Sequence, residues 1–376
     1  MFGRVVYAIN WYSLAAVFAF TAAEFHQNVS GLGLATAAFF VGIGLFQVPG
    51  GILAAKIGPR LTATYGTAIA SMAALLSGFA GNLLEIAILR FFVGLGMAFV
   101  FAPGVTLMSR YLKEGSAGLA VGLYNSAFSF GAVIGLLGWA VLAAAIGWRI
   151  SLITGGALGL FTAVLLFAMV PKDFLRADFS MELRHLRLVL LDKWLIVLSV
   201  AVLGFQAGST IYSNFVSYYL ETQVHVNVGE AGTIASLASL FAFAAAPYAG
   251  RIFDTSGNLK RLLLASGALM AVGVSLPLFG TVDSAILSGI LVGLGSGCGF
   301  TFGFAAARAA NKLDKEYETL AVSWVNGISL FGDFVPPLLY SFLAIHYGYS
   351  AAWLCMGIVA FVLLIPMLFV RVSRQK

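Results

Sequence analysis

A succession of apolar stretches constrains this chain more than any other feature. Each stretch is about 20 residues long and nearly free of charge, which is the length that an α-helix needs to cross the hydrocarbon core of a bilayer. We therefore predict an all-α membrane protein with twelve transmembrane helices. The expected spans are residues 5–24, 32–55, 62–81, 84–108, 118–143, 148–170, 195–219, 231–249, 262–281, 285–307, 320–344 and 351–370. Only 10% of the 376 residues are charged, against about 25% in soluble domains, so a globular fold in water is excluded.

The positions of Lys and Arg predict which side of the membrane each loop faces. If the N-terminus is cytoplasmic, all but two of the 21 Lys and Arg residues fall in cytoplasmic segments, the exceptions being Arg90 and Arg149. Positive residues concentrate in cytoplasmic loops, so we expect both termini to be cytoplasmic and the protein to lie in the cell membrane. This distribution accounts for the net charge of +6 without a nucleic-acid partner.

An internal repeat divides the chain into two halves. The sequence VGLG occurs at 93–96 and again at 292–295, and LAVGLYNSAFSFG at 119–131 aligns with LAVSWVNGISLFG at 320–332. Because the repeats fall in the fourth and fifth spans of each half, the two halves have the same orientation. We expect three parts, which are a six-helix bundle at 1–170, a cytoplasmic loop at 171–193 and a second six-helix bundle at 194–376.

Two glycine-containing loops occupy equivalent places in the two halves. GGILAAKIGPR at 50–60 resembles the inner-loop signature Gly-x-x-x-Asp-Arg/Lys-x-Gly-x-Arg of the major facilitator superfamily, with Ala55 at the acidic position. GRIFDTSGNLKR at 250–261 is the second copy, and LRFFVGLGMA at 89–98 and GWR at 147–149 are similar to further patterns of that family. On these motifs the chain is identified as a member of the major facilitator superfamily over essentially its whole length.

The resemblance implies that the two loops form an inner gate. The candidate gate residues are Gly51, Lys56, Gly58, Arg60, Gly250, Asp254, Gly257 and Arg261. A carboxylate in such a loop is favourable at the N-terminal end of a helix, where the helix dipole is positive. The resemblance also implies a central cavity lined by spans one, four, seven and ten, with contributions from spans two, five, eight and eleven.

Two charged residues, Asp333 and Arg90, lie inside predicted spans. A charge at the bilayer centre costs about 2.5–3.5 kcal/mol on insertion scales, and such residues face the bundle interior or a wet cavity. Asn326, Ser329 and Asp333 share one helical face, and Pro336 interrupts the helix just after them. We predict proton coupling by Asp333, because apolar surroundings favour its neutral form, with Arg90 as a second candidate. The alternatives are a structural carboxylate and an arginine that braces the helices.

Uncharged polar residues are further candidates for substrate contact. They are Asn10, Tyr12, Gln47, Asn125, Gln206, Tyr212, Asn214 and Asn326. Each also suits a hydrogen bond between helices, so the sequence leaves both roles open. The chain has no G-x-S-x-G, H-E-x-x-H or Walker motif and no metal-ligand spacing, so we expect neither an enzyme nor a cofactor or metal site.

These observations predict a secondary transporter that moves a small polar or anionic organic solute by alternating access, with protons as the coupling ion. Its partners would be the small-molecule substrate, the lipid bilayer and protons, and we expect a monomer. One alternative is an efflux transporter of hydrophobic or cationic compounds, which the 32 Phe residues would suit. Another is a membrane sensor on the same fold that does not transport.

Overall fold

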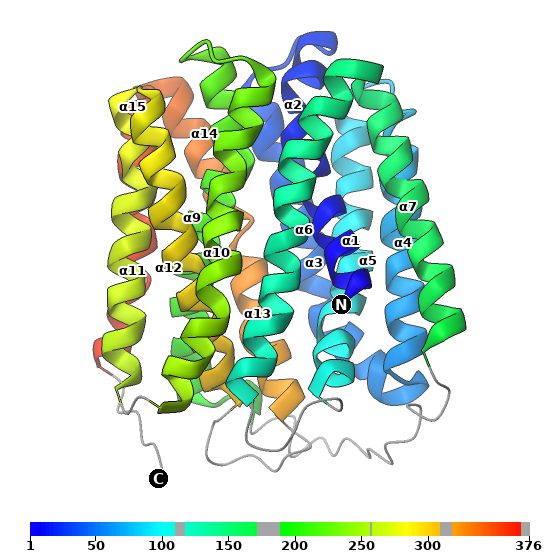
Figure 1. The fold of residues 1–376 in the computed structure, drawn as a ribbon, viewed down its shortest axis with the longest axis vertical. Helices are drawn as coiled ribbons and strands as arrows, with labels where there is room; N and C mark the ends of the chain where they lie inside the picture. The colour runs from blue at the N-terminus through cyan, green and yellow to red at the C-terminus, as the bar shows by residue number, and fades with distance from the viewer. Residues whose placement is uncertain (110–116, 171–188, 256–257, 309–317, 370–376) are drawn as a thin grey trace.

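The computed structural model describes residues 1–109, 117–170, 189–255, 258–308 and 318–369 (Figure 1). The described residues form helices joined by short turns, and no strand occurs among them. The helices are α1 (Phe2–Trp11), α2 (Ser13–Glu24), α3 (Val29–Ile57), α4 (Pro59–Ser77), α5 (Leu83–Ser109), α6 (Ala117–Ile146), α7 (Trp148–Met169), α9 (Lys193–Thr222), α10 (Val228–Thr255), α11 (Leu259–Ser275), η2 (Leu276–Phe279), α12 (Val282–Arg308), α13 (Glu318–Gly332), α14 (Val335–Tyr347), α15 (Tyr349–Val362) and η3 (Ile365–Leu368). The predicted all-α fold is confirmed, while most of the predicted loop at 171–193 lies outside the described residues.

Eleven helical segments of the described chain are long and apolar enough to cross a membrane. They match eleven of the twelve predicted spans, and the span predicted at 62–81 is the exception. Most of that stretch forms α4, whose Thr and Ser side chains lower its hydropathy. The hydroxyls of Thr62, Thr64 and Thr67 each donate to a carbonyl of their own helix. Such internal hydrogen bonds reduce the cost of burying polar side chains.

Two of the spans are interrupted along their length. The first is divided into α1 and α2 at Tyr12, and the eleventh is divided into α13 and α14 at Asp333 and Phe334. Pro336 and Pro337 follow the second interruption, and proline has no backbone N–H to donate. Each interruption takes backbone groups out of the regular helical pattern, so those groups need other partners inside a membrane.

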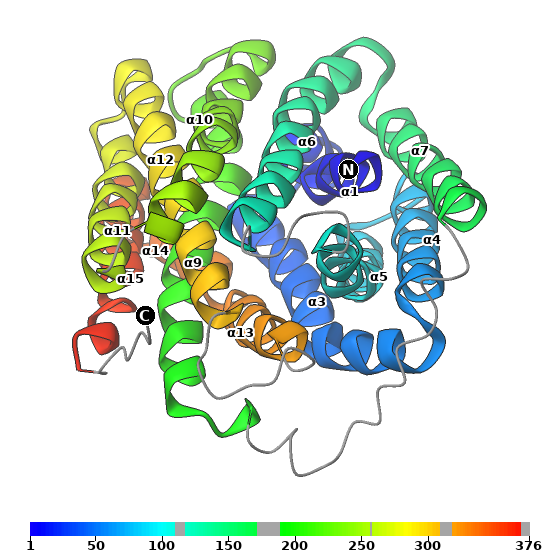
Figure 2. The ribbon, with the colours of Figure 1, turned by 60° about the horizontal axis from the view of Figure 1, so that its bottom comes forward.

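Helices α1–α7 lie on one side of the molecule and α9–α15 lie on the other (Figures 1 and 2). The two groups meet where α6 packs against α10 and where α3 packs against α13 and α14. Helix α2 also packs against α9, toward the upper end in Figure 1. Residues far apart in the sequence are therefore brought together between the two groups.

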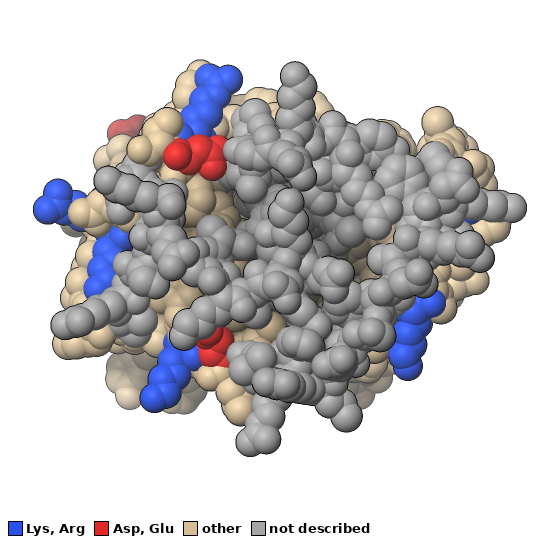
Figure 3. Space-filling view, turned by 90° about the horizontal axis from the view of Figure 1, so that it is seen from below, with Lys and Arg blue, Asp and Glu red and all other residues tan. Residues whose placement is uncertain are grey.

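Basic side chains mark the lower end of the molecule in Figure 1. Lys56 lies in the last turn of α3, Lys193 begins α9, and Arg261 lies in the first turn of α11. Seen from below, the described Lys and Arg side chains lie around the rim of this face (Figure 3). This is the face that the distribution of charge predicts to be cytoplasmic.

Helix α6 holds α1 in place through two glycines. A Cβ atom at Gly131 would collide with the carbonyl oxygen of Val5 and would lie 2.9 Å from the Cβ atom of Ala8. A Cβ atom at Gly135 would lie 3.1 Å from the Cα atom of Ile9. Small residues allow this close approach, as they commonly do between transmembrane helices. The contact fixes the position of every side chain that α1 carries.

We predict that Gly131→Ala destabilises the protein by about 1–3 kcal/mol, because the added methyl group meets backbone that cannot easily move. Gly138→Ala on the same helix is the matched control, since a Cβ atom there has no neighbour closer than 4.0 Å. The control should be neutral or stabilising by about 0.5–1 kcal/mol, as Ala favours helix over Gly. Thermal unfolding of the purified variants in detergent measures both effects, and equal melting temperatures would refute the packing argument.

Candidate functional site

A central cavity lies between the two groups of helices, with a volume of about 80 Å³. Its described lining comes from both groups. The residues are Arg4, Tyr7, Trp11, Tyr12, Phe101, Asn125, Phe128, Ser129, Gln206, Ser209, Ser213, Ala238, Ser239, Ala242, Ala246, Ser296, Gly297, Phe300, Phe304, Asn326 and Leu330. Arg4 is the one charged residue among them, and the lining includes no Asp or Glu. The cavity therefore has a positive electrostatic character.

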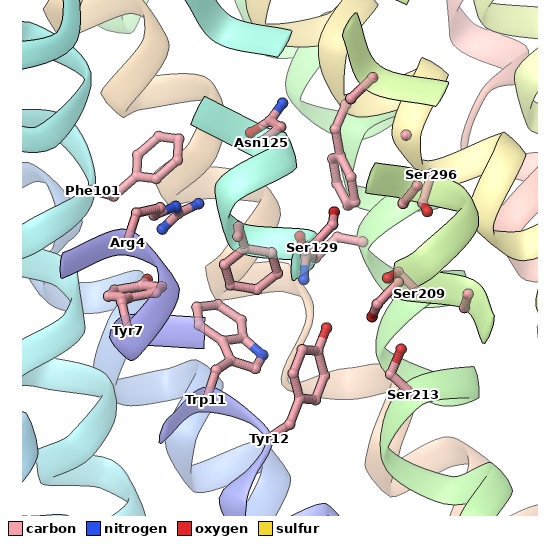
Figure 4. A pocket seen from close by; sticks show the side chains of 18 of the residues that line it. Arg4, Tyr7, Trp11, Tyr12, Phe101, Asn125, Ser129, Ser209, Ser213 and Ser296 are labelled. Atoms are coloured by element: carbon pink, nitrogen blue, oxygen red, sulfur yellow. The ribbon is translucent and has the colours of Figure 1, made fainter. Parts of the chain in front are cut away.

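The guanidinium of Arg4 lies in a cage of aromatic rings. It is 4.6 Å from the ring centres of Tyr7, Tyr124 and Phe128 and 5.0 Å from that of Phe101, which are cation–π distances. Arg4 is only 8% exposed, and its Nε and Nη1 groups have no hydrogen-bond partner among the described residues. Figure 4 shows the guanidinium between Phe101 and Tyr7 at the edge of the cavity. Arg4 is thus a buried cation that lines the cavity with two of its N–H groups lacking a partner among the described residues.

The opposite wall of the cavity carries neutral polar groups. Gln206, Ser209 and Ser213 come from α9, and Ser296 comes from α12. In Figure 4 the hydroxyl of Tyr12 points across toward Ser209 and Ser213. Hydroxyl and amide groups both donate and accept hydrogen bonds. This wall can therefore bind an uncharged polar group without a charged partner.

Pairs of aromatic rings join the two groups of helices toward both ends of the molecule. Toward the upper end Phe18 of α2 packs edge-on against Tyr218 of α9, with ring centres 5.6 Å apart. Toward the lower end Phe101 of α5 packs against Phe304 of α12, also at 5.6 Å. All four side chains are buried. Each pair joins the two groups of helices; Phe101 and Phe304 also line the cavity, whereas Phe18 and Tyr218 lie outside its lining.

Asp333 lies behind the polar wall, at the interruption between α13 and α14. It is fully buried, and its Oδ2 atom accepts a hydrogen bond of 2.5 Å from Thr210 Oγ1. Gln206, which lines the cavity, donates to the same Thr210 oxygen over 3.3 Å. The Oδ1 atom of Asp333 has no partner within the described part of the chain. A hydrogen-bonded series therefore leads from the cavity through Gln206 and Thr210 to a buried carboxyl group.

Arg90 is buried outside the cavity lining. Its Nη2 group donates to the carbonyl oxygen of Trp11 over 3.0 Å, and its guanidinium lies 4.6 Å from the ring centre of Phe39. Trp11 is the last residue of α1, so its carbonyl lies at the interruption in the first span. The geometry gives Arg90 the bracing role that the sequence left as an alternative.

The predicted substrate-contact residues divide into two sets. Tyr12, Asn125, Gln206 and Asn326 line the cavity. The others do not appear in its lining, and they are Asn10, Gln47, Tyr212 and Asn214.

Most of the second set makes hydrogen bonds within or between helices. Asn10 and Asn214 donate to carbonyl oxygens one turn earlier in their own helices. The hydroxyl of Tyr212 lies 3.1 and 3.0 Å from carbonyl oxygens of α10 and α12. Gln47 is fully buried, and its amide has no partner among the described residues.

Comparison with known proteins identifies the family. The model of the Major Facilitator Superfamily matches residues 1–216 and 198–376. The chain belongs to this superfamily. The predicted resemblance is thus confirmed, as is the prediction that the chain is not an enzyme, since the superfamily relatives are named as transporters.

Several curated superfamily members are similar over part of their length. The probable sulfoacetate transporter SauU of Cupriavidus necator is 33% identical over 40% of this chain and 35% of its own length. The probable L-galactonate transporter of Escherichia coli is 28% identical over 38% of this chain and 31% of its own. The inner membrane transport protein YnfM of Escherichia coli is 27% identical over 63% and 57%. The matches thus span about a third to just over half of these relatives.

Solved superfamily structures have the same fold. A bacterial homologue of the human lysosomal transporter Spinster, inward-facing and occupied, gives a TM-score of 0.70 at 16% identity, covering 97% of this chain and 92% of that one. The human organic anion transporter MFSD10 gives 0.72 at 12% identity, covering 97% of each. Such low identities show a shared fold and nothing finer.

The residues of the first superfamily loop have distinct surroundings. Gly58 has a φ of 90°, which suits glycine, and joins α3 directly to α4. Gly51 faces Ser323 of α13, whose Oγ atom would lie 3.8 Å from an added Cβ. Lys56 is exposed. Arg60 instead donates to the carbonyl oxygen of Phe167 within the same group of helices, so it braces α4 against α7.

The second loop is described only in part. Gly250 is buried in α10, and Asp254 is exposed near the end of that helix. The backbone N–H of Arg261 donates to Asn258, which caps α11. Gly257 lies outside the described residues. The gate role of both loops remains a prediction.

The sequence reasoning missed Arg4. We counted it as a marker of topology, because basic residues near a terminus normally lie in a cytoplasmic segment. The signal that could have revealed it is the helical spacing of Arg4, Tyr7 and Trp11, which places all three on one face of α1. That face is the one that lines the cavity.

We predict that Arg90→Leu lowers the free energy of unfolding by about 1–3 kcal/mol, because the buried carbonyl of Trp11 loses its donor. The control is Arg261→Leu, which removes an exposed guanidinium and should change stability by less than about 0.5 kcal/mol. Thermal unfolding in detergent compares the two variants. An unchanged melting temperature for Arg90→Leu would show that the hydrogen bond to Trp11 is dispensable.

Proposed function

We propose that the chain is a secondary transporter that moves a small organic anion together with a proton across the cell membrane. The observation that carries this proposal is the buried guanidinium of Arg4, which lines a cavity whose described lining contains no carboxylate and has two N–H groups without a partner among the described residues. A buried charge without a counter-ion is costly. A bound anion would supply the missing charge through strong, charge-assisted hydrogen bonds.

The relatives support an anionic substrate. Sulfoacetate and L-galactonate, which appear in the names of two relatives, are both organic anions, and MFSD10 is described as an organic anion transporter. The positive charge of Arg4 in the cavity lining also favours an anionic substrate. It also disfavours efflux of cations, because a cation would meet Arg4 with no carboxylate among the described lining residues.

Asp333 is the proposed proton carrier. Its carboxyl group is fully buried and forms no ion pair among the described residues. Gln206 and Thr210 connect it to the cavity by hydrogen bonds. A proton on Asp333 would remove a buried charge, and a bound anion would offset the charge of Arg4. Loading both sites together would therefore carry no uncompensated charge through the membrane.

Alternating access follows from the proposed division into two six-helix halves, 1–170 and 194–376. Rocking of the halves would separate one aromatic pair while the other stays closed, with Phe18 and Tyr218 toward the outside and Phe101 and Phe304 toward the cytoplasm. The basic rim of the lower face supports a cytoplasmic location for that end. We propose that the monomer is the working unit, since one chain supplies both walls of the cavity. If the chain were instead a sensor that does not transport, it would bind the anion without moving it across the membrane. The experiments below measure binding and transport separately.

We predict that Arg4→Leu weakens binding of organic anions by about 10–100-fold, the value of one or two hydrogen bonds to a charged group. The variant should still fold, because the substitution removes the buried charge and its unpartnered N–H groups at the same time. The measurement is the rise in melting temperature with anion concentration. Arg90→Leu is the control that should keep this response. Equal anion responses for Arg4→Leu and wild type would remove the basis of the proposal.

We predict that Asp333→Asn abolishes proton-driven accumulation of the anion but preserves exchange of anion across the membrane. Asparagine keeps the shape and can accept the hydrogen bond from Thr210, yet it cannot carry a proton. Proteoliposomes loaded with a pH-sensitive dye report proton movement when anion is added outside. Asp283→Asn, at an exposed position in the first turn of α12, is the matched control. Wild-type accumulation by Asp333→Asn would show that another group couples the proton.

A further inference from the structure

We infer that the cavity selects organic monoanions that carry a neutral hydrogen-bonding group away from the anionic group, and that it rejects dianions. This inference rests on the proposed function and narrows its substrate class. It comes from the unequal chemistry of the two walls, which Figure 4 shows on opposite sides of the cavity.

The cationic side consists of one guanidinium among aromatic rings. Only Arg4 supplies positive charge, and Tyr7, Phe101 and Phe128 surround it with apolar surface. Rings of this kind exclude water, so the attraction between the guanidinium and an anion acts in a low dielectric. One such group neutralises one negative charge. The anionic end of the substrate is therefore expected at Arg4.

The polar side follows the helical repeat of α9. Gln206, Ser209 and Ser213 are spaced three and four residues apart, which places them on one face of that helix, and all three line the cavity. Ser239, Ser296 and Asn326 add neutral groups from neighbouring helices. Together they offer several donors and acceptors but no charge. Such a wall recognises a hydroxyl, amide or carbonyl group.

A second anionic group would be unfavourable at this wall for two reasons. The described wall contains no Lys or Arg to neutralise it, and burying an unpaired carboxylate is costly. Asp333, which is reached through Gln206 and Thr210, supplies no positive charge in either of its protonation states. A wholly apolar end is disfavoured as well, because the serine and amide groups would lose water without gaining a partner.

The enclosed volume sets a limit on size. About 80 Å³ is available in the cavity, well below the roughly 300–1,000 Å³ of sites for drug-sized ligands. The substrate that fits the closed cavity is therefore small, with its two polar ends separated by a short apolar body. The Phe and Ala residues of the lining suit such a body.

The test uses matched sets of three compounds that differ only at the far end. One set is para-hydroxybenzoate, para-toluate and terephthalate, and the other is gamma-hydroxybutyrate, valerate and succinate. Binding to the purified full chain is measured as the rise in melting temperature with ligand concentration. In at least one set, the hydroxy acid should bind at least tenfold more tightly than both the apolar acid and the dianion.

Two serine variants locate this preference. The double variant Ser209→Ala, Ser213→Ala should reduce the advantage of the hydroxy acid over the apolar acid by at least fivefold, while binding of the apolar acid stays the same or improves. Ser217→Ala is the matched control, because Ser217 is buried on the same helix but is absent from the cavity lining. It should leave the preference unchanged.

The outcomes separate the two proposals. If anions bind through Arg4 but the dianion binds as tightly as the hydroxy acid, the inferred selectivity is overturned and the proposed function stands. The same holds if the serine double variant keeps the full preference for the hydroxy acid. If none of the six compounds binds the wild-type chain, this selectivity and the anion transport on which it rests both fail.

Discussion

A polypeptide inside a bilayer has no water to satisfy its backbone, so every interruption of a helix needs a partner from the protein itself. The first and eleventh spans are both interrupted here; Tyr12 at the first interruption lines the central cavity, and Asp333 at the second is connected to it through Thr210 and Gln206. At the first, Arg90 donates to the carbonyl oxygen of Trp11. At the second interruption, the backbone N–H of Asp333 donates to the carbonyl oxygen of Ser329, and that of Phe334 donates to the carbonyl oxygen of Phe331. These bonds allow irregular backbone at a depth where only helices are otherwise tolerated.

The interruptions also decide where the charges lie. Arg4 is on the short helix that precedes the first interruption, held against α6 by Gly131 and Gly135. Asp333 forms part of the second interruption. The two charges thus belong to opposite groups of helices and approach the cavity from different sides. In the proposed mechanism, an anion and a proton occupy separate sites in one enclosed space, and the polar wall around Gln206 connects them.

Much of the fold could be predicted from the sequence, because the length of an apolar stretch alone indicates a membrane span. Helix α4 is less apolar than the other spans because of its Thr and Ser side chains, and composition does not reveal that their hydroxyl groups form hydrogen bonds within the protein. The burial of Asp333 was predicted from the cost of charge in a membrane. The rotation of the helices that are apolar all round was not predictable, since they carry no stripe that marks their inner face. Arg90 was a proton-coupling candidate because of its place inside a span, while Arg4, which lines the cavity, was counted with the cytoplasmic basic residues.

The aromatic pairs toward the two ends of the molecule have a thermodynamic consequence. Phe18 with Tyr218, and Phe101 with Phe304, join the two groups of helices through contact between rings. Opening either end transfers buried ring surface into water, and exposure of apolar surface raises the heat capacity. In the proposed alternating-access mechanism, the closed and open states should therefore differ in heat capacity. The free-energy difference between the two states would then depend on temperature in a curved, non-linear way. The closed state would be stabilised by the hydrophobic effect, as a protein core is.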